Sequence, residues 1–186
     1  MSTTKRGFTL IELLVVIAIL AVLATAVVVI LNPAQLIKQG RDSTRISDLA
    51  ALHSAIALYL SEVTTANLTT TSTCTYGTTQ PGGIAGSCVT NAVTLVDGTG
   101  WVSANFGSIS SGSPLSRLPL DPVNDATYYY AYESVVSPTN TFEINANMES
   151  TKYATGGTAD VESNTKDGGD DNNFYEIGND PGLGLF

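Results

Sequence analysis

The hydrophobic positions of the chain form three patterns, and the first is a continuous apolar run near the N-terminus. Leu13 to Leu31 comprises nineteen residues, all apolar except Thr25, and no charged residue occurs between Leu13 and Ile37. A helix needs about 20 apolar residues to cross the hydrocarbon layer of a bilayer. We therefore predict a transmembrane or assembly helix over residues 8–32.

The second pattern is amphipathic and follows Pro33. Charged residues lie on one side of the predicted helix, where Arg45 can pair at i,i+3 with Asp42 and Asp48. The pattern predicts a half-buried stem helix over residues 34–63, with a kink at Pro33. Apolar residues recur on the other side at three- and four-residue steps: Leu49, Leu52, Ile56, Leu60 and Val63.

The third pattern consists of short β-rich runs separated by turn residues. They predict strands over 89–96, 101–106, 128–136 and 141–148, and in the last run apolar and polar residues alternate strictly. We expect a small antiparallel sheet whose apolar face the stem helix covers, which makes the fold α+β. Residues 64–88 and the acidic C-terminal tail are expected to be loops. The head would span residues 64–186.

The charge is unevenly placed along the chain. The formal net charge is −9, and residues 64–186 carry thirteen acidic and three basic side chains. So acidic a head repels nucleic-acid phosphates, and we expect it to bind no nucleic acid directly. His53 is the only histidine, and the sequence has no Walker, dinucleotide or zinc motif. We therefore expect no catalytic site and no enzymatic activity.

Glu12 is a carboxylate at the start of the apolar run. An ionisable group inside a membrane segment is costly and indicates a function and a partner. A plain membrane anchor does not need such a group. A secretory signal peptide, which here would be cleaved after Ala26, does not need it either.

The residues around Glu12 carry a family resemblance. Lys5-Arg6-Gly7 followed by FTLIELLVVIAIL resembles the N-terminal signature of type IV pilins and type II secretion pseudopilins. The resemblance implies that residues 1–7 are a leader, that a prepilin peptidase cleaves between Gly7 and Phe8, and that Phe8 is then N-methylated. Glu12 would then pair with the Phe8 amine of a neighbouring subunit and fix the register of assembly.

The resemblance also implies a function, a location and partners. The chain would be a structural subunit that polymerises into a type IV pilus or a type II secretion pseudopilus. It would begin as a single-pass protein of the cytoplasmic membrane and end in an extracytoplasmic or cell-surface filament. Its partners would be further copies of itself, the prepilin peptidase, and the inner-membrane assembly platform with its ATPase. The alternatives are a monomeric membrane-anchored protein that binds a ligand or calcium, and a secreted protein.

A second resemblance lies at LPLDPVNDATYYYAY, residues 118–132. Pro119 and Pro122 flank Leu120 and Asp121 and predict an extended corner without helix. This segment resembles the LPxDPWGxxYxY corner of G-type major pseudopilins, with Val123 at the aromatic position.

Two further predictions concern the head. Cys74 and Cys88 would form a disulfide in an exported protein, whereas in a cytosolic protein they would be two thiols. Asp167, Asp170 and Asp171 offer the hard oxygen ligands that calcium prefers, and the resemblance to G-type pseudopilins implies a calcium site in this loop. A solvated acidic turn is the alternative, and no cofactor is required.

Overall fold

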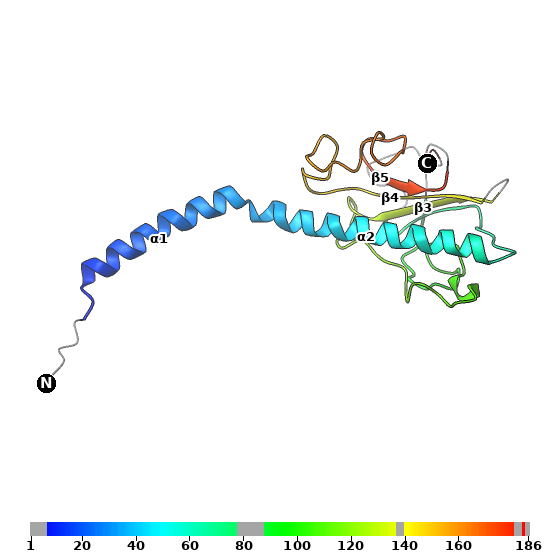
Figure 1. Ribbon diagram of the computed structural model, residues 1–186, viewed down its shortest axis with the longest axis horizontal. Coiled ribbons are helices and arrows are strands. Elements are labelled where there is room, and N and C mark those ends of the chain that lie inside the picture. Colours follow the sequence, from blue (N-terminus) through cyan, green and yellow to red (C-terminus); the bar gives the residue numbers. More distant parts are fainter. Residues whose placement is uncertain (1–6, 78–87, 137–139, 181–183, 185–186) are drawn as a thin grey trace. The chain divides into compact units, whose positions relative to one another are not determined.

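The computed structural model of the chain describes residues 7–77, 88–136, 140–180 and 184. The fold is α+β, as predicted, with helices first and a sheet after them (Figure 1). The chain divides into two compact units, Met1–Ile37 and Lys38–Phe186.

Two helices account for the N-terminal third of the chain. Helix α1 spans Leu10–Leu31 and helix α2 spans Pro33–Glu62. Asn32 separates them in the left-handed conformation, with φ 40°, a conformation that asparagine tolerates better than most residues. Pro33 then opens α2, where its missing amide hydrogen leaves no helical bond unmade.

Five strands form one mixed sheet in the order β2-β1-β3-β4-β5. The central strands β3 (Tyr130–Val135) and β4 (Thr141–Ala146) fall inside the predicted runs and pair antiparallel, and β5 (Tyr175–Gly178) extends the sheet antiparallel to β4. Strand β1 (Thr71–Cys74) is antiparallel to β3 but parallel to β2 (Val89–Thr90). The predicted all-antiparallel sheet is therefore wrong at the β1–β2 edge.

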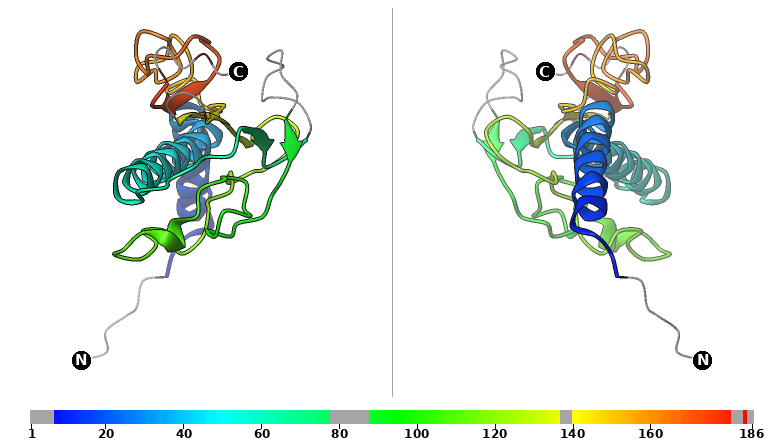
Figure 2. Two further views of the ribbon diagram at one scale, coloured as in Figure 1. Left: turned by 90° about the vertical axis from the view of Figure 1, so that its right-hand side faces the viewer. Right: turned by 90° about the vertical axis from the view of Figure 1, so that its left-hand side faces the viewer.

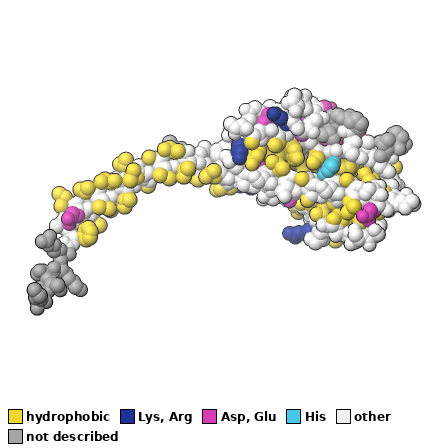
Figure 3. Space-filling model, viewed as in Figure 1, with side chains coloured by type: hydrophobic (Ala, Val, Ile, Leu, Met, Phe, Trp, Pro, Cys, Tyr) yellow, Lys and Arg dark blue, Asp and Glu magenta, His cyan; other side chains and the backbone are white. Residues whose placement is uncertain are grey.

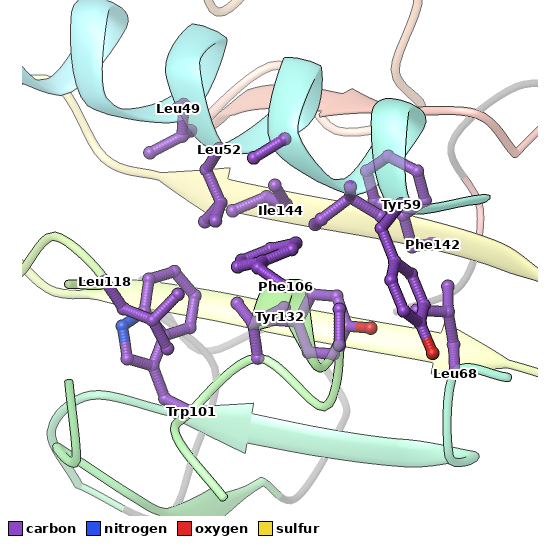
Figure 4. Close-up of a cluster of buried hydrophobic side chains, with 14 of the residues drawn as sticks. Leu49, Leu52, Tyr59, Leu68, Trp101, Phe106, Leu118, Tyr132, Phe142 and Ile144 are labelled. Atoms are coloured by element: carbon purple, nitrogen blue, oxygen red, sulfur yellow. The ribbon is translucent and has the colours of Figure 1, made fainter. Parts of the chain in front are cut away.

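Helix α2 covers one face of the sheet, as the sequence predicts (Figure 4). Leu49, Leu52 and Ile56 are fully buried, and they belong to one core with Phe142 and Ile144 of β4. Burying a side chain of this size stabilises a fold by roughly 1.5–3 kcal/mol. The core also contains Trp101, Phe106, Leu118, Tyr130 and Tyr132.

The strands predicted over 89–96 and 101–106 are wrong except for Val89–Thr90. The two segments bond to each other only at isolated points, such as the amide of Trp101 to the carbonyl of Val93. Other bonds go to distant segments: the amide of Leu118 donates to the carbonyl of Thr94, and the Thr73 hydroxyl donates to the carbonyl of Trp101. Trp101 and the next residue, Val102, are both buried, which a strand with one solvent face does not allow. The Trp101 region therefore wraps the core as irregular chain, and η2 (Phe106–Ser108) is its short helical turn.

Strands β1 and β5 lie in segments that were predicted to be loops. Thr71–Cys74 is rich in Thr and Ser, and Tyr175–Gly178 follows a run of acids and glycines, so neither has an apolar alternation. Both form because a neighbouring strand offers them hydrogen bonds, β3 for β1 and β4 for β5. The segment between β4 and β5, orange in Figures 1 and 2, lies beside β5.

Arg45 joins α2 to two distant parts of the head. Its guanidinium binds both oxygens of Asp121 at 2.6 and 2.9 Å, Asp42 at 2.8 Å, and Glu149 at 2.8 Å. Burial by itself would lower the pKa of Arg45, but these carboxylates outweigh it and raise the pKa above its ordinary value. The predicted Asp42–Arg45 pair is thus confirmed, and both side chains are fully buried although they lie on the charged side of α2.

Backbone amides complete the coordination of two of these carboxylates. Asp42 accepts from the amides of Glu149 and Ser150, at 2.9 and 2.8 Å, and Asp121 accepts from those of Val123 and Asn124. Asp121 lies between Pro119 and Pro122 in the predicted extended corner, and residues 119–122 form neither helix nor strand. The backbone of the corner therefore orients the Asp121 carboxylate toward Arg45 of α2.

The disulfide between Cys74 and Cys88 is present, with the two Cα atoms 5.6 Å apart. Both cysteines are buried and form a small cluster with Tyr129 and Ala131 on the sheet face opposite α2. The bridge therefore holds the strand pair β1–β2 at the edge of the sheet.

Arg45→Ala should lower the free energy of unfolding by about 3–5 kcal/mol, because it leaves the buried carboxylates of Asp42 and Asp121 without their cation. Arg45→Lys keeps the charge but cannot bind Asp121 through two nitrogens, so its loss should be intermediate. Urea unfolding of the detergent-solubilised chain measures both. Arg41→Ala is the matched control, since Arg41 is partly exposed and pairs with Glu149, and it should cost much less. Equal losses for Arg45→Ala and Arg41→Ala would contradict the role given to Arg45.

Replacing both Cys74 and Cys88 with serine should lower the free energy of unfolding by about 3 kcal/mol, because the bridge restricts a loop of about 15 residues in the unfolded chain. Urea unfolding again gives the value, and a reducing agent should shift the unmodified protein by a similar amount. The double variant should not respond to the reducing agent, and a response would show that the shift has another origin.

Candidate processing and assembly segment

A capping box closes the N-terminal end of α1. Thr9 is the N-cap residue: its hydroxyl accepts from the amide of Glu12 at 3.3 Å, and Glu12 Oε2 accepts from the amide of Thr9 at 2.8 Å. Each side chain thus satisfies an amide that the helix itself leaves unbonded. Sequence reasoning missed this role of Thr9, although the spacing Thr-x-x-Glu is its known signature.

The cap leaves part of the Glu12 carboxylate available. The Thr9 hydroxyl also donates to Oε2 at 2.8 Å, and within the described part of the chain no hydrogen bond reaches Oε1. Glu12 is exposed, and the helix N-terminus favours a negative charge there. The geometry therefore lets Glu12 cap its own helix while Oε1 accepts a hydrogen bond from another molecule or pairs with a positive charge on it.

The bond between Gly7 and Phe8 lies before the helix begins. Both residues are exposed, Phe8 to 88%, and a side-chain atom added at Gly7 would meet nothing within 4 Å. A protease needs an exposed, non-helical backbone of this kind. The rest of the predicted leader, residues 1–6, lies outside the described residues.

The side chains of α1 are apolar on all sides of the helix. Apart from Glu12 and Thr25 every residue of α1 is apolar, and its described side chains are all exposed (Figure 3). The Thr25 hydroxyl donates to the carbonyl of Ala21 at 2.8 Å, so its donor is hydrogen-bonded without water. By length and composition, the helix that begins at Leu10 could cross a membrane, and it is the one such helix among the described residues. It is consistent with a single membrane anchor.

The acidic turn does not gather its carboxylates around a common point. Asp167 accepts from the amides of Gly169 and of Glu176 in β5, and Asp171 accepts from the amide of Asn173, so both carboxylates already accept from backbone amides. In the described part of the chain, no three His, Cys, Asp or Glu side chains are placed to hold a metal ion. Calcium at Asp167, Asp170 and Asp171 stays a prediction.

A second group of carboxyls lies under this turn, on the sheet. Burial, together with the neighbouring carboxyls of Glu143 and Asp167, raises the pKa of Glu176 to about 8, although the amide of Asp171 donates to it. Sequence reasoning missed both glutamates as a buried group. The period-two pattern of residues 141–148 assigns Glu143 to the polar side of its strand, and nothing in that pattern indicates that the polar side is covered.

Comparison with known proteins adds evidence at the N-terminus. No curated protein and no solved structure matches the chain significantly. Residues 2–28 match the family model described as the prokaryotic N-terminal methylation motif. The matched segment includes Gly7, Phe8, the capping box and most of α1. The chain therefore carries the prepilin-type N-terminal signal of type IV pilins and pseudopilins.

Proposed function

We propose that this protein is a structural subunit that polymerises through α1 into a type IV pilus or a type II secretion pseudopilus. The observation that carries the proposal is an exposed helix, apolar on all sides, that begins with a single carboxylate inside the matched methylation motif. The motif fits a structural role, and we propose that the protein has no catalytic activity of its own.

Processing by a prepilin peptidase between Gly7 and Phe8 is the first step. It removes Lys5 and Arg6 and creates a new amine on Phe8, one residue before the helix cap at Thr9. Such an amine is largely protonated at neutral pH, because α-amino groups have pKa values of about 7.7–8.0. N-methylation of Phe8 keeps an amine at this position. Cleavage thus replaces two side-chain charges, which lie before the apolar segment, with one charge at its very end.

Assembly follows from the need to cover α1. In the membrane, lipid covers the apolar surface, whereas in a filament the α1 helices of neighbouring subunits cover one another. Each Glu12 then lies in an apolar environment, where a charge without a partner is unfavourable. The Phe8 amine of a neighbouring copy is the partner we propose, because Glu12 Oε1 accepts no hydrogen bond within the described part of its own chain. Such a pair selects one register between the helices, because their apolar surfaces alone do not favour a particular register.

The remaining assignments follow from this mechanism. Before assembly the subunit is a single-pass protein of the cytoplasmic membrane, with residues 64–186 as an extracytoplasmic head, and afterwards it belongs to an extracytoplasmic or cell-surface filament. Its partners are further copies of the chain, the prepilin peptidase, and the inner-membrane assembly platform with its ATPase. The head binds no nucleic acid directly, since its surface charge is strongly negative.

Three variants separate the two roles of Glu12. Glu12→Gln keeps an oxygen that can accept from Thr9, so it preserves the capping box but removes the charge. Thr9→Val removes the hydroxyl of the cap but keeps the charge on Glu12. Charge pairing predicts that Glu12→Gln and Glu12→Ala reach the membrane but yield few filaments, whereas Thr9→Val yields filaments. Sheared-filament yield, divided by the amount of subunit in the membrane, is the measurement.

The opposite ranking would overturn the mechanism. If Glu12→Gln assembles normally and Thr9→Val does not, Glu12 acts by capping its own helix and not by pairing between subunits. If the unmodified chain is processed at Phe8 but never leaves the membrane as filaments, even with the assembly machinery present, the proposal of a filament subunit fails and a monomeric anchored protein is correct.

A further inference from the structure

The face of the sheet that points away from α2 contains buried polar side chains. Strand β4 directs Phe142 and Ile144 into the core, so Glu143 and Asn145 lie on the opposite face. That face of an antiparallel sheet usually meets water, but Glu143 and Asn145 are both 0% exposed. A polar pair that is removed from water in this way needs compensating partners.

The strand register brings Glu176 to the same place. Asn145 lies directly opposite Glu176 in the β4–β5 pair, and directly opposite residues of antiparallel strands have Cβ atoms about 4.5–5.5 Å apart. Glu176 is 1% exposed, and its carboxyl is hydrogen-bonded to that of Glu143. Two buried carboxyls therefore meet beside one buried amide. Two carboxylates within hydrogen-bond distance of each other cannot both keep their negative charge unless a positive charge lies between them.

The buried amide of Asn145 indicates a bound ligand. Within the described part of the chain, neither Oδ1 nor Nδ2 of this fully buried amide has a hydrogen-bond partner. Its neighbour on the other side, in β3, is Ala131, whose methyl group cannot form a hydrogen bond. A buried polar group without a partner in a native fold calls for a bound ion, a water or a strain that explains it. The amide oxygen is, in addition, a ligand that calcium accepts.

The acidic turn closes over these side chains. A Cβ atom at Gly169 would overlap the carboxylate of Glu176, so only glycine allows the turn to lie so close. The amide of Asp171 donates to Glu176 Oε2 at 3.0 Å, and Asp167 accepts from the amide of Glu176 at 3.1 Å. The turn thus forms a lid over Glu176 and shields the group from water.

We propose that Glu143, Asn145 and Glu176 bind a hard divalent cation of the calcium type between β4 and β5. Two carboxylates and one amide oxygen offer up to five of the six to eight oxygens that calcium takes, and water or backbone carbonyls supply the rest. A single proton shared by the two glutamates would cancel one charge but would leave the Asn145 oxygen without a partner. A cation can bind both carboxylates and the Asn145 oxygen at once.

This site differs from the calcium site predicted in the acidic turn, because Asp170 and Asp171 are not among its ligands. It is also independent of the proposed function, since it concerns the head and not α1. Bound there, the ion links β4 to β5, and through Glu176 it secures the turn above. We therefore expect the ion to stabilise the C-terminal part of the head.

Calcium titration of the detergent-solubilised full chain, after treatment with a chelator, tests the proposal. Isothermal calorimetry should show one site, and about 1 mM calcium chloride, the weak end of the range for extracellular calcium modules, should raise the melting temperature. Glu176→Gln and Asn145→Leu should each weaken calcium binding roughly tenfold or more. Asn145→Leu also removes the unpartnered amide, so without calcium its melting temperature should be at least that of the unmodified chain. Asp170→Asn, the matched control in the acidic turn, should bind calcium normally.

Two outcomes would overturn the site. Absence of calcium binding to the unmodified chain at this concentration is the first. The second is loss of binding in Asp170→Asn with normal binding in both Asn145→Leu and Glu176→Gln, which would locate the ion in the acidic turn. The titration uses unassembled protein, so neither outcome depends on whether the chain forms filaments.

Discussion

The apolar surface of α1 has to be covered by something other than its own chain. Every described side chain of this helix is exposed, and the helix has no polar face that could be turned to water. Lipid and other copies of the same helix are two environments that suit such a surface. In the proposed filament, the second would also offer Glu12 the Phe8 amine of a neighbouring copy as a positive partner. In the proposed filament, the single carboxylate would convert a general preference for apolar surroundings into a preference for one arrangement of neighbours.

The core of the head consists of residues from the unit Lys38–Phe186. Helix α2, the sheet and the irregular chain around Trp101 bury one common core. Arg45 then connects α2 to the proline corner through Asp121 and to the chain after β4 through Glu149. Because these contacts all lie in the unit from Lys38 to Phe186, the apolar helix remains free for lipid or for neighbours. The residues that stabilise the head are therefore different from those of α1, to which we assign assembly.

The sequence predicts the helices, the central strands and the disulfide well, because each depends on a local pattern or on a pair of rare residues. Sequence reasoning fails for β1 and β5, which form because β3 and β4 offer them hydrogen bonds. It also fails for residues 91–96 and 101–106, which bond to each other only at isolated points and otherwise to distant segments. Asp42–Arg45 is visible as a helical pair, but its burial depends on Asp121, 76 positions further along. The Glu143–Asn145–Glu176 group is equally invisible, since only the strand register brings it together. Gly7, Phe8 and Glu12, in contrast, are identified by a motif within a few residues of one another.

The mass of the subunit in purified filaments tests the central claim most directly. Polymerisation through α1 after cleavage predicts that each subunit begins at Phe8, lacks the preceding seven residues and carries one N-terminal methyl group. Filaments whose subunits retain residues 1–7 would have no free amine beside Glu12, and subunits that begin at Val27 would lack Glu12 altogether. Either result would contradict the account.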